Sequence, residues 1–123
     1  MPCLFAAALS GYGIPGVRFE PVRFTPVDPG DGKFGGEELG GVRLVALDAA
    51  YDPTRAALAL LTETRRLSGE RWSWREAHFD RLAGTDRLRE GIEAGLPVEE
   101  LRAGWDEALK RFQALRQPYL IYP

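Results

Sequence analysis

The sequence is poor in the side chains that most often bind metals. Among 123 residues it has one cysteine, Cys3, and one histidine, His78. A disulfide needs two cysteines, and structural zinc sites use four ligands drawn mainly from cysteine and histidine. The composition therefore excludes an internal disulfide, Cys₂His₂ and Cys₄ zinc sites, and any metal site with two histidine ligands. We expect no metal and no cofactor.

The chain also lacks a long apolar run and a cluster of basic residues. A membrane-spanning helix needs about 20 apolar residues. The apolar stretch from Pro2 to Leu9 is far shorter and lacks the basic residues that open a signal peptide. The 16 Lys and Arg and 18 Asp and Glu residues are interspersed, for a net charge of −2. We therefore expect a soluble chain with no nucleic-acid or membrane partner, and a cytoplasmic location is favoured.

Candidate catalytic groups are equally scarce. Most glycosidases place two carboxyl groups about 5 to 9.5 Å apart on either side of the scissile bond. Glu37 and Glu38 are adjacent and would point in opposite directions on an extended chain. Glu99 and Glu100 suit the first turn of a helix, where the helix dipole is enough to explain them. A triad built on His78 would have no serine in a nucleophile elbow, so the residues alone predict no catalytic site.

The residues that are present suit a small α+β protein. About 45% of them are hydrophobic, which supplies one core, and 123 residues is the size of one ordinary domain. Alternating apolar and charged residues predict a strand at 17–24, at a sheet edge or bulged at Pro21, and a second strand at 42–47. Helices are predicted at 2–10, 53–67 and 85–94. We expect a small mixed sheet packed against three to four helices, in a single compact domain spanning 1–123.

A last helix is the clearest predicted element. Its apolar residues recur every three or four positions and form one stripe of Val98, Leu101, Trp105, Ala108, Phe112 and Leu115. We expect this stripe to be buried, so that Trp105→Ala or Phe112→Ala would each cost about 3–5 kcal/mol. Pro118 ends the helix, and residues 119–122 are predicted to form a short strand that pairs with the sheet.

A long glycine-rich loop, from Pro26 to Gly41, separates the two predicted strands. Loops of this length inside compact domains are usually functional or disordered. Glycine gives the loop a large backbone entropy to lose, so we expect it to become ordered only against a partner or a ligand. Its charged residues Lys33 and Glu37 would then be available to a sugar or to a partner surface.

Several short motifs occur in an order and spacing that resemble a known bacterial family. They are Gly16-Val17-Arg18-Phe19-x-Pro21-Val22-x-Phe24-Thr25-Pro26, Lys33-Phe34-x-Gly36-Glu37, Gly40-Gly41-Val42, Phe79-Asp80-Arg81-Leu82-x-Gly84-Thr85-Asp86-x-Leu88-Arg89 and Arg116-x-Pro118-Tyr119-Leu120-Ile121-Tyr122. Over roughly residues 11 to 122, the set resembles the C-terminal domain of NamZ-type exo-β-N-acetylmuramidases. Leu39 and Arg43 depart from the family pattern, where cysteine and glutamine are expected.

The resemblance implies one domain of a longer enzyme. Family members join an N-terminal Rossmann-like domain to this C-terminal domain, with the sugar site in a cleft near their junction. They remove N-acetylmuramic acid from the non-reducing ends of peptidoglycan fragments, and their catalytic glutamate belongs to the N-terminal domain. The resemblance therefore implies no catalytic residue here, a muropeptide sugar as ligand, and four candidate cleft residues: Lys33, Glu37, Asp80 and Arg81.

Two functional interpretations follow. In the first, the chain is an auxiliary domain that completes a substrate cleft together with a Rossmann-like partner domain. In the second, it is a stand-alone interaction module, a homodimer with no sugar chemistry. For Asp80 and Arg81 the alternative role is a structural pair that anchors the next helix. Trp72 and Trp74 either stack on a sugar ring or, as is more usual for aromatic residues, pack in the core.

Overall fold

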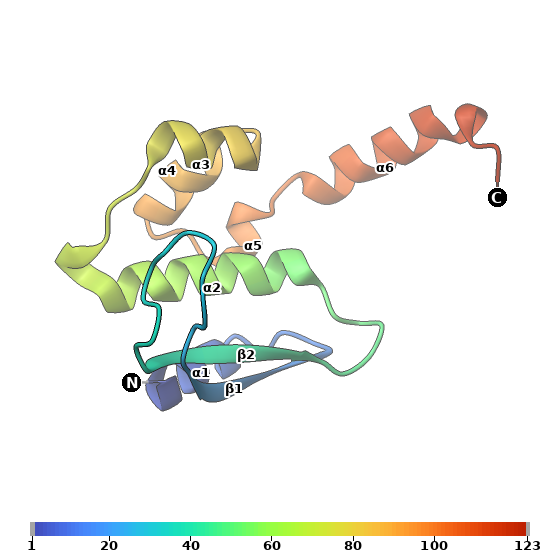
Figure 1. Cartoon of the computed structure of the whole chain (residues 1–123). Helices are drawn as coiled ribbons and strands as arrows, with labels where there is room; N and C mark the ends of the chain where they lie inside the picture. Colours follow the sequence, from blue (N-terminus) through green and yellow to red (C-terminus); the bar gives the residue numbers. More distant parts are fainter. Residues whose placement is uncertain (1, 123) are drawn as a thin grey trace. The chain divides into compact units, whose positions relative to one another are not determined.

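Helices make up most of the regular structure among residues 2–122, the part of the chain that the structure describes, and one antiparallel pair of strands completes it (Figure 1). The structure is a computed structural model. By contact density the chain divides into two compact units, Met1–Trp74 and Arg75–Pro123. The α+β class predicted from the sequence is confirmed. One domain spanning residues 1–123 stays a prediction.

The first unit contains the sheet and the longest helix. Its elements in chain order are α1 (Pro2–Ser10), β1 (Val17–Phe24), β2 (Leu39–Ala46), α2 (Pro53–Ser68) and the 3₁₀ turn η1 (Gly69–Arg71). The second unit is helical, with α3 (Glu76–Ala83), α4 (Arg87–Glu93), α5 (Val98–Leu101), α6 (Trp105–Arg116) and the 3₁₀ turn η2 (Gln117–Tyr119).

The two strands pair in a continuous register. Val17 lies opposite Ala46 and Phe24 opposite Leu39, with one residue facing one residue throughout. Pro21 lies opposite Val42 inside this register, so the edge strand is confirmed and a bulge is not formed. The long loop between β1 and β2 projects away from the strands (Figure 1). Among the described residues the sheet is two-stranded and antiparallel, which corrects the expectation of a mixed sheet.

Helix α2 begins as the sequence predicts. The side chain of Asp52 accepts hydrogen bonds from the backbone N–H groups of Thr54, at 2.9 Å, and Arg55, at 3.3 Å, and Pro53 occupies the first turn. The first half of α2 is buried through Ala56, Leu58 and Ala59. Helix α1 contacts both strands and α2, and contributes Ala6 and the fully buried Leu9 to the same core.

The second unit has a small core formed by α4 and α5. Ile92, Val98 and Leu101 are its buried side chains. Gly91 is also buried, and a Cβ at this position would lie 2.5 Å from Leu101 Cδ2. A side chain at position 91 would therefore require the Leu101 side chain to move. The sequence predicted α4 two residues too early, and it missed α3 altogether.

The long helix predicted at 98–115 is wrong. It is interrupted between α5 and α6 by Gly104, whose φ of 83° lies in the left-handed region that an α-helix cannot contain. The interruption separates the predicted stripe into a buried part, Val98 and Leu101, and an exposed part on α6. Phe112 is 57% exposed and Leu115 is 66% exposed, so a buried stripe through α6 is contradicted.

The predicted terminal strand is also wrong. Residues 117–119 form η2, and residues 120–122 have no strand partner. Tyr119, Ile121 and Tyr122 are each more than four-fifths exposed. Pro118 lies inside the 3₁₀ turn η2, directly after α6, so it does not open an extended strand. The chain therefore ends, in its described part, with apolar side chains at the surface.

Candidate functional site

The glycine-rich loop carries two of the four candidate cleft residues, Lys33 and Glu37, both exposed. Lys33 Nζ lies 3.9 Å from Asp31 Oδ2, and the backbone N–H of Lys33 donates to Asp31 Oδ1 at 3.1 Å. The backbone N–H of Glu37 donates to the carbonyl of Phe34 at 3.1 Å. In the described structure the carboxylate of Glu37 has no hydrogen bond or ion pair, so it is available to a ligand or a partner.

The same loop contains an unfavourable backbone conformation. Phe34 has a φ of 57°, in a region that bulky residues adopt only at a cost in free energy. Its ring is 57% exposed, so burial of the side chain does not offset this cost. The conformation therefore places a strained, exposed aromatic residue between Lys33 and Glu37.

The other two candidates, Asp80 and Arg81, are neighbours on α3 with different surroundings. Arg89 of α4 donates to Asp80 from Nη2 at 2.9 Å and from Nε at 3.1 and 3.2 Å. Both side chains are largely buried, with 22% of Asp80 and 14% of Arg89 exposed. The hydrogen bonds to Asp80 raise the pKa of Arg89 above its ordinary value, although burial opposes this. This geometry favours the structural role for Asp80, with Arg89 as its partner.

Arg81 takes no part in the Asp80–Arg89 pair. Its side chain is exposed, and its Nη2 lies 3.0 Å from Nδ1 of His78, one turn earlier on α3. Arg81 is therefore a surface cation, and it is the more accessible of the two α3 candidates. The first unit thus holds Lys33 and Glu37 on one loop, and the second holds Asp80 and Arg81 on one helix.

A buried carboxylate forms the centre of the main polar network in the first unit. Glu63 is 7% exposed, and it accepts a hydrogen bond from the Tyr12 hydroxyl at 2.9 Å and from Arg66 Nε at 2.8 Å. Burial alone would raise the pKa of Glu63, but the hydrogen bonds from Arg66 and Tyr12 outweigh it and hold the pKa below its usual value. Burial, together with the bond to Glu63, raises the pKa of Tyr12 to about 12.

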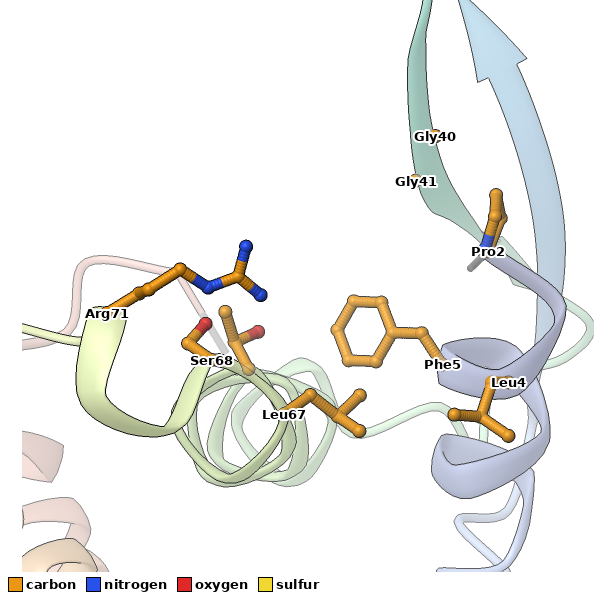
Figure 2. A pocket seen from close by; sticks show the side chains of 9 residues that line it. Pro2, Leu4, Phe5, Gly40, Gly41, Leu67, Ser68 and Arg71 are labelled. Atoms are coloured by element: carbon orange, nitrogen blue, oxygen red, sulfur yellow. The ribbon is translucent and has the colours of Figure 1, made fainter.

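A pocket in the first unit, which we name the Arg71 pocket, combines apolar and polar walls (Figure 2). Its volume is about 370 Å³. Figure 2 shows the guanidinium of Arg71 pointing into the pocket from the end of α2 and η1, and the ring of Phe5 pointing into it from α1. The nine lining residues are Pro2, Leu4, Phe5, Gly40, Gly41, Thr64, Leu67, Ser68 and Arg71.

Trp72 and Trp74 pack against each other. Their ring centroids are 5.0 Å apart and the ring planes are nearly perpendicular, at 88°. Both side chains are half-buried. An edge-to-face pair uses the face of one ring for the other tryptophan, so the two rings do not form one flat platform for a sugar.

Metal-binding clusters and membrane-spanning helices are both absent from the described residues. Between residues 2 and 122, no group of three or more His, Cys, Asp or Glu side chains is arranged to hold a metal ion. No helix in that range combines the length and apolar character needed to cross a bilayer.

Comparison with known proteins identifies the family to which the chain belongs. The model for the family described as "Exo-beta-N-acetylmuramidase NamZ, C-terminal" matches residues 2–122. The chain belongs to this family. It is 30% identical over 116 residues to the peptidoglycan β-N-acetylmuramidase NamZ of Bacillus subtilis, a match that covers 93% of this chain. The whole chain also superposes on part of a DUF1343 family protein from Bacteroides fragilis, with a TM-score of 0.84 at 23% identity, which supports the fold.

Both relatives are much longer than this chain. The match covers 27% of the Bacillus subtilis protein and 33% of the Bacteroides fragilis chain. The resemblance noted in the sequence motifs is confirmed by the family match. The chain therefore spans about a third or less of the length of each of these relatives.

Sequence reasoning missed several residues of these sites. Arg71 belongs to no motif, and only the fold brings it near Phe5. Tyr12 and Glu63 are 51 positions apart, so no local spacing reveals their bond. Arg89 could have been identified from the sequence, because it is the last residue of the motif that contains Asp80. The nine-residue separation between them spans the turn between α3 and α4.

Proposed function

We propose that this chain is an auxiliary domain related to peptidoglycan exo-β-N-acetylmuramidases. It would complete a substrate cleft but would not be catalytic on its own. The observation that carries the proposal is the extent of the family match. The C-terminal family model spans residues 2–122, whereas the chain spans 27% of the curated relative. The remaining 73% of that relative is large enough to contain a Rossmann-like catalytic domain.

The carboxylates of the chain support the absence of independent catalysis. A glycosidase general acid needs a raised pKa, so that it is protonated near neutral pH. The most buried carboxylate, Glu63, has its pKa lowered by Arg66 and Tyr12. Asp80 is held by Arg89 in a bidentate pair. Glu63 therefore lacks the raised pKa of a glycosidase acid, and Asp80 is engaged by Arg89 within the fold.

The exposed apolar side of α6 supports a partner. Trp105, Leu109, Phe112 and Leu115 recur at helical spacing and are 38%, 54%, 57% and 66% exposed. A hollow of about 550 Å³, lined by Leu88, Leu96 and Trp105 among others, continues this surface within the second unit. Contiguous apolar surface of this kind marks contact sites for other proteins. We propose that the Rossmann-like partner domain covers it.

The experiment that tests the proposal is an activity measurement on the purified chain. The chain should release no N-acetylmuramic acid from peptidoglycan fragments and no chromophore from a β-N-acetylmuramide. Turnover above buffer that disappears when a carboxylate of this chain is mutated would contradict an auxiliary role.

A second candidate function is a homodimeric interaction module, and the same α6 surface favours it. In that case two copies would cover each other's apolar stripes, with no sugar chemistry. Sedimentation equilibrium distinguishes the candidates. A monomer at micromolar concentration supports the auxiliary domain, and a dimer that Phe112→Asp dissociates supports the module.

A further inference from the structure

The Arg71 pocket combines a cation, an apolar wall and an open strand edge within the first unit of the chain. We propose that it is a binding site for the carboxyl-terminal end of a peptide. Arg71 holds the terminal carboxylate, the apolar wall takes the last side chain, and the edge of β2 pairs with the peptide backbone. This binding activity is separate from the proposed role in a sugar cleft.

Arg71 is the only charged residue among the nine that line the pocket. Its guanidinium points into the space (Figure 2), and it forms no hydrogen bond or ion pair with another described residue. Arg66 and Arg89, by contrast, are already engaged by Glu63 and Asp80. A planar guanidinium with free donors is suited to bidentate recognition of a carboxylate. Charge complementarity therefore favours an occupant with one carboxylate.

The wall opposite Arg71 is apolar. Phe5 and Leu67 face the interior, with Leu4 beside them (Figure 2). The volume of about 370 Å³ lies within the range of small-ligand pockets. An inorganic anion would leave this wall in contact with water, whereas an apolar group on the occupant would bury it favourably. The occupant should therefore carry an apolar side chain beside its carboxylate.

The open edge of β2 forms a third part of the pocket. Gly40 and Gly41 are consecutive residues of β2, and Figure 2 shows them beside the pocket with β1 on the far side of the strand. In the described sheet β2 pairs with β1 only. In an antiparallel pair, every second residue directs its N–H and C=O groups away from the partner strand. One of the two glycines therefore offers both groups to an extended peptide, as in β-strand addition.

Together these three features select the end of a peptide over other carboxylates. In the last residue of a peptide, the carboxylate, the side chain and the amide nitrogen are all attached to one carbon. One residue can therefore reach Arg71, the apolar wall and the edge of β2 within a single pocket. A simple apolar acid lacks the amide groups. An aspartate or glutamate inside a peptide lacks an apolar side chain on the same residue.

The end of α2 makes the role of Arg71 testable. Leu67 and Ser68 lie in the last turn of α2, where the helix dipole and the last carbonyl groups disfavour an anion. Arg71 must outweigh this repulsion for a carboxylate to bind. Without its charge, the pocket should prefer an uncharged peptide amide, so removal of Arg71 should reverse the preference rather than weaken all binding equally.

The test uses the whole ¹⁵N-labelled chain and compares four probes. They are acetyl-Ala-Ala-Leu with a free carboxylate, the same peptide with a terminal amide, acetyl-Ala-Ala-Gly with a free carboxylate, and 4-methylpentanoate, which has the leucine side chain and the acid without peptide groups. We expect the first peptide to bind at least fivefold more tightly than each of the other three probes. Its binding should shift the amide signals of Gly40, Gly41 and Ser68.

Two variants complete the test. Arg71→Gln should lower the affinity for the free-acid leucine peptide at least fivefold, to or below that for its amide. Arg43→Gln, at an exposed β2 arginine that does not line the pocket, should bind as wild type. Because Arg71 is exposed and has no partner among the described residues, the urea midpoint of Arg71→Gln should equal that of wild type. A loss of binding is then not a loss of fold.

Several results would overturn the proposal. They are an absence of binding, equal affinity for the acid and the amide, equal affinity for the leucine and glycine peptides, or an Arg71→Gln variant that binds as wild type. If 4-methylpentanoate binds as tightly as the leucine peptide, the pocket is a site for small apolar acids and the peptide proposal fails. None of these measurements involves turnover, a sugar or a partner domain, so this proposal and the auxiliary role can fail separately.

Discussion

Glu63 shows how a buried charge can be tolerated in so small a protein. Removing a carboxylate from water is costly unless hydrogen bonds replace those lost. Tyr12 and Arg66 supply them, and together they link the turn after α1 to the middle of α2. The network is local to the first unit and gives it a defined dependence on pH.

Acid should weaken the first unit through Glu63. Its folded pKa lies below the ordinary value of 4.5, so its contribution to stability is complete above that pH and is lost as the pH falls through the folded pKa. Glu63→Gln should lower the free energy of unfolding at pH 7 by about 1–2 kcal/mol. It should also flatten the acid side of the stability profile, measured by urea denaturation at several pH values.

Alkali acts on the same network through Tyr12. Its pKa is raised from 10.0 to about 12, so its stabilising contribution is present below pH 10 and is lost as the pH rises toward 12. In an absorbance titration, one of the four tyrosines should ionise late, and Tyr12→Phe should remove that late step. A titration without a late step, or a late step that Tyr12→Phe leaves in place, would contradict the Tyr12–Glu63 bond.

Asp80 and Arg81 should respond to mutation in opposite ways. Asp80→Asn weakens a largely buried bidentate pair and should cost the fold about 1–2 kcal/mol. Arg81→Ala removes an exposed side chain and should change stability by less than about 0.5 kcal/mol. Thermal midpoints of the two variants decide this. Equal destabilisation would show that Arg81 is as firmly packed as its neighbour.

At the scale of elements, α6 does not have the structural role that its periodicity suggests. Helical spacing of apolar residues shows that burial of one helix face is favourable, but it does not show which part of this chain or which other molecule buries that face. Gly104 is the signal in the sequence that divides the stripe, because glycine inside a helix is unfavourable. Figure 1 shows α6 extending away from α3 and α4 within the second unit.

Mutations should separate the core of the second unit from its exposed helix. Ile92 is 1% exposed, and Ile92→Ala should lower the free energy of unfolding by about 2–5 kcal/mol. Phe112→Ala should lower it by less than about 1 kcal/mol, since Phe112 is already 57% exposed. Chemical denaturation of both variants checks this. A loss of about 3–5 kcal/mol for Phe112→Ala would instead support the original prediction that the stripe is buried.

The elements that the sequence predicted well are those with local signals. The Asp52–Pro53 start of α2 and the strand at 17–24 were predicted from neighbouring residues, and the structure confirms both. What was missed depends on contacts between distant residues. Helix α3 spans only eight residues, too few for a clear helical period of apolar residues, and it is held by the hydrogen bonds that Arg89 donates to Asp80. The expectation that the glycine-rich loop becomes ordered only when it contacts a ligand or a partner stays a prediction.

At the scale of the whole molecule, we propose that the chain presents functional surfaces and depends on a partner domain for catalysis. The loop with Lys33 and Glu37, the Arg71 pocket and the α6 stripe are accessible, while the carboxylates Glu63 and Asp80 are committed to structure. The family match assigns the whole arrangement to the C-terminal part of longer proteins. The central claim is therefore that function requires a partner domain.

A domain exchange tests this claim most directly. In the Bacillus subtilis relative, the segment matched by this chain is replaced with residues 1–123, and release of N-acetylmuramic acid is measured. Truncation of the segment is the negative reference, and the same exchange with Phe112→Asp is the matched control. We expect the exchanged protein to be active, truncation to abolish activity, and Phe112→Asp to lower activity at least tenfold. Full activity of the truncated protein would contradict the account, because the domain would then complete nothing.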